Sequence, residues 1–237
     1  MRLLVTRSEP EATATAATLR SRGHEVIVDP MLEIMFEPSP EAIAPKGLVV
    51  SSKNGVRALA SWPAAKAWHE LPLFAVGDET ADAARAEGFA ATRSASGSAE
   101  ELAALVMREF PPKQGLLLNV AAAERTPTIE VRLSEAGYDL ATAIAYRATP
   151  AASLAPETTA ALEAGEIDGI LLFSRRAAET LRGLLPRTGL RRAVRDVDVY
   201  ALSEKTAGGF SGVAARSIRI APHPDAESLL GLIPLAR

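Results

Sequence analysis

The chain contains no cysteine and only three histidines among its 237 residues. The absence of cysteine excludes disulfide bonds, thiolate metal ligands, a cysteine nucleophile and cysteine-bound iron–sulfur clusters. The histidines, His24, His69 and His223, are far apart and show neither HxxxH nor HExxH spacing. A histidine-based metal site is therefore not expected.

An excess of positive charge is also missing, because 26 lysines and arginines stand against 29 acidic residues, for a net charge of −3. Nucleic-acid binding needs a basic face, so nucleic acid is not an expected partner. No run of about twenty apolar residues occurs, which predicts no transmembrane helix and no membrane partner. The first residues enter a strand-like run without the features of a signal peptide, so we expect a cytoplasmic protein.

What the sequence does contain is a regular alternation of strand-like and helix-like segments. Residues 2–6 and 26–28 predict strands, and the stretch 11–22 between them predicts a helix that begins near Pro10 and ends at Gly23. Such alternation along the whole chain predicts an α/β protein with mostly parallel sheets.

Four segments of the first half recur in the same order in the second half, shifted by roughly 114 to 127 residues. The pairs are 19–26 with 133–140, 48–52 with 170–174, 74–81 with 200–207, and 98–102 with 225–229. His24 matches Tyr138 in this repeat and is expected at the surface. The shared order predicts a duplicated α/β unit, hence two lobes with a ligand-binding cleft between them.

Taken together, these segments resemble the uroporphyrinogen-III synthase family. The resemblance runs from residue 1 to about residue 230 and is carried by an ordered set of short motifs: LVTR at 4–7, GHEV at 23–26, SSKNGVRA at 51–58, VGDETA at 76–81, YR at 146–147, FS at 173–174 and LSEKTA at 202–207. It implies an α/β fold of two similar lobes, each a parallel sheet flanked by helices, joined by a two-stranded connector, with an interlobe cleft.

The resemblance also implies domain boundaries. A flavodoxin-like lobe one would comprise residues 1–32 and 149–237, lobe two residues 37–142, and the connector strands about 32–36 and 143–148. The residues alone would place a boundary near Pro111 and Pro112 instead.

For function, the resemblance implies a cofactor-independent, cyclising hydro-lyase of tetrapyrrole biosynthesis. It would dehydrate the linear tetrapyrrole hydroxymethylbilane, invert the last pyrrole ring through a spiro intermediate, and close the macrocycle to uroporphyrinogen III. Without an enzyme the same precursor closes without inversion, so the protein's task is positioning and selective stabilisation of one transition state. The implied setting is a cytoplasmic monomer with a transient handover of substrate from hydroxymethylbilane synthase.

The substrate carries an acetate and a propionate on each ring, so a protein of net charge −3 must offer local donors. The expected donors are helix N-termini after Ser52, Thr80, Ser174 and Thr206, and charged side chains beside them. Tyr146 is the candidate proton donor to the leaving hydroxyl. The candidate substrate-binding residues are Arg7, Ser51, Ser52, Lys53, Asn54, Thr80, Ser174, Arg175, Lys205 and Thr206.

Simpler interpretations stay open. The hydroxyl residues could serve only as helix N-caps, and Tyr146 could be a packing residue on a strand. The chain also departs from the family, because residues 119–123 replace a glycine-bearing turn and Ser203 stands where many members carry glycine. A non-catalytic tetrapyrrole-binding or regulatory protein of the same fold is the alternative. A nucleotide-dependent enzyme ranks lower, because neither GxGxxG nor GxxxxGK[ST] occurs.

Overall fold

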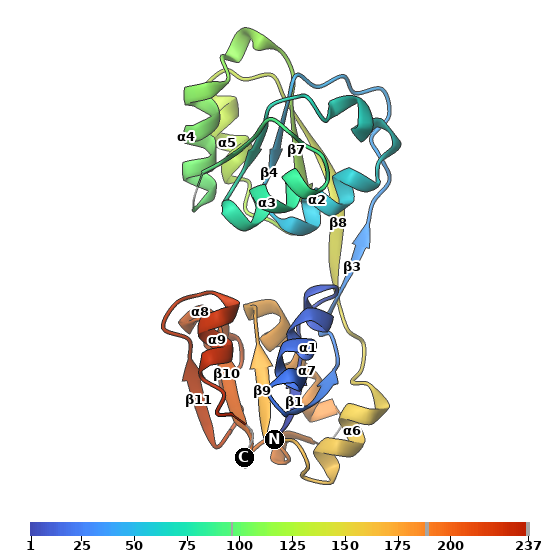
Figure 1. The fold of residues 1–237 in the computed structure, drawn as a ribbon, viewed down its shortest axis with the longest axis vertical. Coiled ribbons are helices and arrows are strands. Elements are labelled where there is room, and N and C mark those ends of the chain that lie inside the picture. The colour runs from blue at the N-terminus through green and yellow to red at the C-terminus, as the bar shows by residue number, and fades with distance from the viewer. Residues whose placement is uncertain (96, 188–189, 236–237) are drawn as a thin grey trace. The chain divides into compact units, whose positions relative to one another are not determined.

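The computed structural model describes residues 1–95, 97–187 and 190–235. The chain divides into two compact units, which we call unit 1 (residues 1–33 and 149–237) and unit 2 (residues 34–148). Each unit is built on its own sheet (Figure 1). In the described ranges, no helix combines the length and apolarity that crossing a membrane requires.

Unit 1 contains a five-stranded parallel sheet in the order β11-β10-β9-β1-β2. Numbered along the unit, this is the order 2-1-3-4-5 of flavodoxin-like sheets, in which the winding direction reverses between β1 and β9. The strands are β1 (Arg2–Val5), β2 (Glu25–Val28), β9 (Gly169–Leu172), β10 (Asp198–Ala201) and β11 (Ser217–Ile220).

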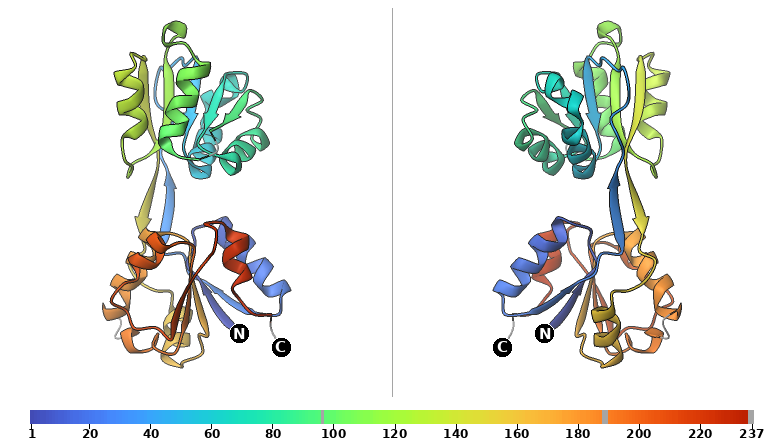
Figure 2. Two further views of the ribbon diagram at one scale, coloured as in Figure 1. Left: turned by 90° about the vertical axis from the view of Figure 1, so that its left-hand side faces the viewer. Right: turned by 90° about the vertical axis from the view of Figure 1, so that its right-hand side faces the viewer.

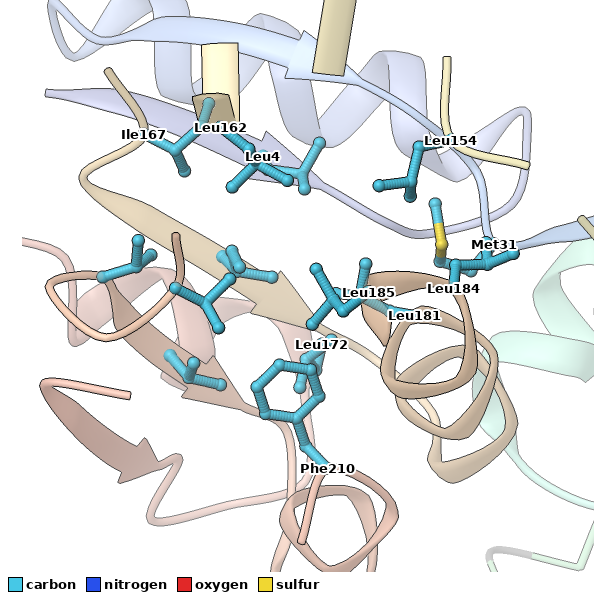
Figure 3. Close-up of a cluster of buried hydrophobic side chains, with 14 of the residues drawn as sticks. Leu4, Met31, Leu154, Leu162, Ile167, Leu172, Leu181, Leu184, Leu185 and Phe210 are labelled. Carbon is cyan, nitrogen blue, oxygen red and sulfur yellow. The ribbon is translucent and has the colours of Figure 1, made fainter. Parts of the chain in front are cut away.

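Helices cover both faces of this sheet, so its central strands are apolar throughout rather than alternating. Leu4 and Leu172 point to one face, where they pack with Leu181 and Phe210 in the cluster of Figure 3. Leu3, Val5 and Leu171 point to the other face with Leu229. The helices are α1 (Glu11–Ser21), α6 (Pro156–Glu163), α7 (Arg175–Arg187), α8 (Glu204–Gly209) and α9 (Ala226–Gly231), with a 3₁₀ turn at Leu190–Arg192.

Unit 2 contains a six-stranded sheet in the order β3-β8-β7-β4-β5-β6. The five neighbouring strands β8, β7, β4, β5 and β6 are parallel. Numbered from β4, the parallel strands follow the doubly wound order 3-2-1-4-5, with its reversal between β4 and β7. The boundaries between the two units fall inside β3 and near the end of β8. The strands are β3 (Leu32–Phe36), β4 (Gly47–Val50), β5 (Leu73–Ala75), β6 (Thr92–Ser94), β7 (Leu117–Ala122) and β8 (Leu140–Pro150).

Two helical layers enclose the sheet of unit 2. One face carries α2 (Lys53–Ser61) and α3 (Asp78–Ala86), together with the 3₁₀ segment Pro63–Trp68. The other face carries α4 (Ala99–Glu109) and α5 (Thr128–Glu135), and Figure 2 shows these layers on opposite sides. A second 3₁₀ turn, Pro112–Gln114, connects α4 to β7. Neighbouring strand residues, such as Val49 and Val50, therefore belong to different cores.

The predicted α/β class with parallel sheets flanked by helices is confirmed. The helix predicted over 11–22 spans Glu11–Ser21, and Gly23 follows it with a φ of 84°. A boundary near Pro111 is wrong, because β7 returns to pair with β4 in the same sheet. The surface position expected for His24 is also wrong: its side chain is buried, because the turn through Gly23 folds the chain back against α1.

Candidate active site

The strand order of each unit fixes where a ligand is expected to bind. In doubly wound sheets, ligands bind beyond the carboxyl ends of the strands at the point where the winding reverses. In unit 2 this point is flanked by residues 51–54, which follow β4, and by Ala123, which follows β7. In unit 1 it is flanked by residues 6–8, which follow β1, and 173–175, which follow β9. Most of the predicted site residues therefore lie at one of these two points.

The first turn of α2 is built around Ser52. Ser52 is the N-cap residue, and its Oγ accepts a hydrogen bond from the backbone N–H of Gly55 at 3.0 Å. Gly55 lets this turn pack closely on the strands, because an added Cβ would lie 3.0 Å from Val50 Cγ1 and 3.3 Å from the Val120 carbonyl oxygen. The sequence Ser-x-x-Gly thus both caps the helix and brings its N-terminus against the end of β7.

Tyr146 reaches the same corner from β8. The pairing of β7 with β8 is irregular between Ala121 and Ala122, so that Ala122 lies opposite Tyr146. Beyond it, the Ala123 N–H donates to the Tyr146 carbonyl at 2.9 Å. Bulges of this kind redirect side chains and are frequent beside active sites. The segment that departs from the family pattern therefore extends β7 and holds the backbone of Tyr146.

Ser52 and Tyr146 meet through their side chains. Ser52 Oγ and Tyr146 Oη are 2.9 Å apart, and both residues are half-buried. The tyrosine ring also packs against the apolar cluster beneath α2. The structure thus joins the predicted proton donor to a predicted binding residue, although they are 94 positions apart in the sequence.

The charged residues of this corner already have partners. Lys53 Nζ donates to Glu79 Oε2 at 2.7 Å, and Arg57 Nη1 donates to Asn54 Oδ1 at 2.9 Å. Ser51 is exposed at the end of β4. A carboxylate ligand at this corner would have to compete with Glu79 for the ammonium group of Lys53.

The matching corner of unit 1 repeats this arrangement. Ser174 Oγ accepts from the Ala177 N–H at 3.1 Å, as Ser52 does from the residue three positions on. Arg175 Nε donates to Glu179 Oε1 at 2.8 Å, and this hydrogen bond lowers the pKa of Glu179, so the carboxylate stays charged. The guanidinium of Arg7 lies 4.7 Å from the ring centroid of Phe173, a cation–π contact between the two flanking loops.

The helix N-termini expected after Thr80 and Thr206 begin earlier than predicted. The helices start at Asp78 and Glu204, directly after Gly77 and Ser203, and the two threonines lie in the first turns. Both side chains are nearly buried, at 6% and 4% exposure. Ser203 takes the capping role that the sequence suggested for Thr206: its Oγ accepts from the Thr206 N–H at 3.2 Å. Lys205, beside it, is exposed.

Within the described ranges, no group of three or more His, Asp and Glu side chains is arranged to hold a metal ion. The groups that the structure presents at these corners are hydroxyls, backbone N–H groups and paired cations. Such groups can orient an anionic substrate and pass a proton.

Comparison with known proteins decides the family. The sequence profile of uroporphyrinogen-III synthase HemD matches residues 13–231, which is most of the chain. The chain belongs to the uroporphyrinogen-III synthase family. Members of this family are cofactor-independent cyclising lyases of tetrapyrrole biosynthesis, and their substrate is a tetrapyrrole. The family resemblance predicted from the short motifs is confirmed.

Two solved structures share the fold. Uroporphyrinogen-III synthetase from Helicobacter pylori has a TM-score of 0.64 and 19% identity, covering 98% of each chain. A mutant uroporphyrinogen III synthase from the extremely thermophilic bacterium Thermus thermophilus has a TM-score of 0.58 and 22% identity, covering 98% of this chain and 97% of that one. No curated protein gives a significant match. The individual site residues and the interlobe cleft stay predictions.

Proposed function

We propose that this uroporphyrinogen-III synthase family member converts hydroxymethylbilane to uroporphyrinogen III at the corner formed by Ser52 and Tyr146. The observation that carries the proposal is the 2.9 Å separation of Ser52 Oγ and Tyr146 Oη at the reversal point of unit 2. The packing tyrosine Tyr138 donates its hydroxyl hydrogen to a backbone carbonyl, whereas Tyr146 meets another hydroxyl, which can donate to it and leave its own hydrogen available.

The hydrogen bonds at Ser52 suggest a direction for proton movement. Because Ser52 Oγ accepts from the Gly55 N–H, its own hydrogen is available to Tyr146 Oη. The phenolic hydrogen of Tyr146 is then available to the substrate. Ser52 continues to donate after that proton has left, and a hydrogen bond to a charged oxygen contributes about 1.5–3 kcal/mol.

The proposed step is balanced in atoms and charge. Tyr146 gives its proton to the hydroxyl of hydroxymethylbilane. The carbon–oxygen bond then breaks, water departs, and the remaining molecule is an azafulvene cation. The last ring attacks this cation through its substituted carbon, giving the spiro intermediate, which fragments and closes again with the ring inverted. The proton lost when the final ring regains its aromaticity returns to the phenolate of Tyr146.

The remaining corner residues are proposed to bind substrate carboxylates. Lys53 and Arg175 each hold one carboxylate of the protein, so a carboxylate of the substrate can take the place of Glu79 or Glu179. A small difference in activation free energy is enough for these groups to select one product. A hundredfold preference corresponds to about 2.7 kcal/mol between the two competing barriers. The other carboxylate-binding groups proposed are Arg7, Ser51, Asn54, Ser174 and Lys205. Thr80 and Thr206 are left out of this proposal, because their side chains are buried.

The setting follows from the instability of the substrate. Because free hydroxymethylbilane closes without inversion, a direct handover from hydroxymethylbilane synthase would protect the inverted route. We propose this handover, with the chain acting as a cytoplasmic monomer. Sedimentation analysis with and without hydroxymethylbilane synthase measures both the oligomeric state and the contact.

The test of the proposed function is a product analysis. Freshly made hydroxymethylbilane is given to the protein, and the type I and type III uroporphyrinogens are separated. We expect type III to dominate with the wild-type chain and with Tyr138→Phe, a control that removes a buried hydroxyl bonded to the Phe110 carbonyl. Tyr146→Phe should slow the reaction. A product mixture equal to that of the protein-free control would instead support a non-catalytic tetrapyrrole-binding protein.

A further inference from the structure

Unit 1 has a cavity that the proposed reaction does not use. Its volume is about 340 Å³, and it lies beside the second half of α7 (labelled in Figure 1). The residues that line it are Arg182, Pro186, Arg191, Ser211, Gly212 and Val213. This volume lies within the usual range of small-molecule sites.

The periodicity of α7 explains which residues face the cavity. Leu181, Leu184 and Leu185 are buried in the core beneath the helix, as Figure 3 shows. Arg182 and Pro186 are four positions apart, so they lie on the same face of the helix, beside the face that the buried leucines occupy. Arg182 follows Arg175 by seven positions, or about 10 Å along the helix axis, which places the cavity away from the strand-end corner.

Two guanidinium groups are held at the cavity by neutral acceptors. Arg191 Nη2 donates to the Gly212 carbonyl at 2.6 Å, and Arg182 Nη1 lies 3.5 Å from Ser211 Oγ. Among the described residues, neither guanidinium has a carboxylate within ion-pair distance. Glu179, one turn before Arg182, is bonded to Arg175 instead. The cavity therefore carries two positive charges with donor groups to spare.

Apart from Glu179, whose carboxylate interacts electrostatically with Arg182 as well as with Arg175, the nearby segments add positive charge. Arg192 and Arg195 are exposed in the segment that follows the cavity-lining Arg191, and Asp196 is the one acid between residues 190 and 197. This local excess occurs in a chain whose net charge is −3. Pro186 and Val213 supply an apolar wall of the cavity.

We propose that this cavity binds a small dicarboxylate with an apolar body. One carboxylate would meet Arg182 and the hydroxyl of Ser211, the other would meet Arg191, and the apolar body would lie on Pro186 and Val213. The arginines come from α7 and from the 3₁₀ turn at Leu190–Arg192, so the positive charge is offered at two points. Two separated charges and an apolar wall suit a dicarboxylate better than inorganic phosphate, which is compact and has no apolar part.

Calorimetric titration of the full chain tests this proposal. The probe is isophthalate, a flat dicarboxylate, with isophthalamide as its neutral analogue and inorganic phosphate as the compact anion. We expect saturable binding of isophthalate with one site per chain. Each of Arg182→Gln and Arg191→Gln should weaken it about tenfold or more, since a hydrogen bond between charged groups is lost. The matched control, Arg192→Gln, removes the same charge next to the cavity and should change the affinity less than about twofold.

Four results would overturn the proposal: no saturable binding, equal binding of the amide, tighter binding of phosphate, or equal losses in Arg192→Gln and Arg191→Gln. The proposal is independent of the proposed reaction. Turnover of hydroxymethylbilane should therefore persist in Arg182→Gln and Arg191→Gln, whose unfolding midpoints should stay close to that of the wild type. A failed titration with intact turnover would remove the cavity site alone.

Discussion

Replacing Ser52 by alanine should lower both the unfolding free energy and kcat, and the two effects can be measured separately. The change removes the hydrogen bond from the Gly55 N–H (3.0 Å) and the contact with Tyr146 Oη (2.9 Å). Loss of an N-cap costs about 1 kcal/mol of unfolding free energy. Loss of a hydrogen bond to a developing phenolate costs about 1.5–3 kcal/mol in the barrier, so kcat should fall about ten- to a hundredfold.

Ser98→Ala is the matched control for the stability part. Ser98 caps α4 by accepting from the Glu101 N–H at 3.2 Å, within a capping box, and α4 packs on the face of the sheet opposite to α2 and Tyr146. Its loss should lower the unfolding midpoint about as much as Ser52→Ala, while kcat and KM stay at the wild-type values. Denaturant unfolding measures the first quantity, and initial rates of type III formation measure the second.

A double-mutant cycle tests whether Ser52 affects the rate by positioning Tyr146 or independently of it. If Ser52 acts through the phenol, Ser52→Ala should lower kcat in the wild-type chain and have almost no further effect in Tyr146→Phe. Ser52→Thr, which keeps the hydroxyl, should recover much of the rate. Losses that multiply in the double variant, or an equal loss of kcat in Ser98→Ala, would refute the proposed coupling of Ser52 to Tyr146.

Three further predictions concern stability. Arg216 holds the pKa of Asp198 at about 2, so Asp198→Asn should cost about 1–2 kcal/mol of unfolding free energy near neutral pH. This difference should vanish in acid unfolding as pH falls from about 4 towards 2; a constant difference would contradict it. Burial lowers the pKa of His24, so the wild type should lose unfolding free energy as pH falls below about 6.5, and His24→Gln should flatten this loss. Gly209→Ala should destabilise by about 1–3 kcal/mol because its Cβ would lie 2.6 Å from a backbone carbonyl oxygen of α7, whereas Gly208→Ala, which meets nothing within 4 Å, should be neutral or stabilising in thermal unfolding.

The repeat in the sequence predicted the local structure of the corners well. Ser52 and Ser174 align in the repeat, and the structure gives them the same capping bond to the residue three positions on. Ser98 and Asp225 also align, and both cap their helices in this way. These capping bonds depend only on residues a few positions apart, so they can be predicted from a single sequence.

Features that depend on distant residues could not be read in this way. The contact between Ser52 and Tyr146 requires the pairing of β7 with β8 and the irregularity at Ala121 and Ala122. No local pattern signals that irregularity. The sequence predicts Thr80 at a helix end, because hydroxyl residues are frequent there, but Gly77 precedes the helix and Thr80 is buried.

The most direct measurement of the central claim is the isomer formed by Tyr146→Phe in a single turnover, with protein in excess over hydroxymethylbilane. If the corners set the geometry and Tyr146 supplies only the proton, the reaction should be slower while uroporphyrinogen III remains the main product. A slow reaction that yields the type I isomer in the proportion of the protein-free control would contradict this division of roles.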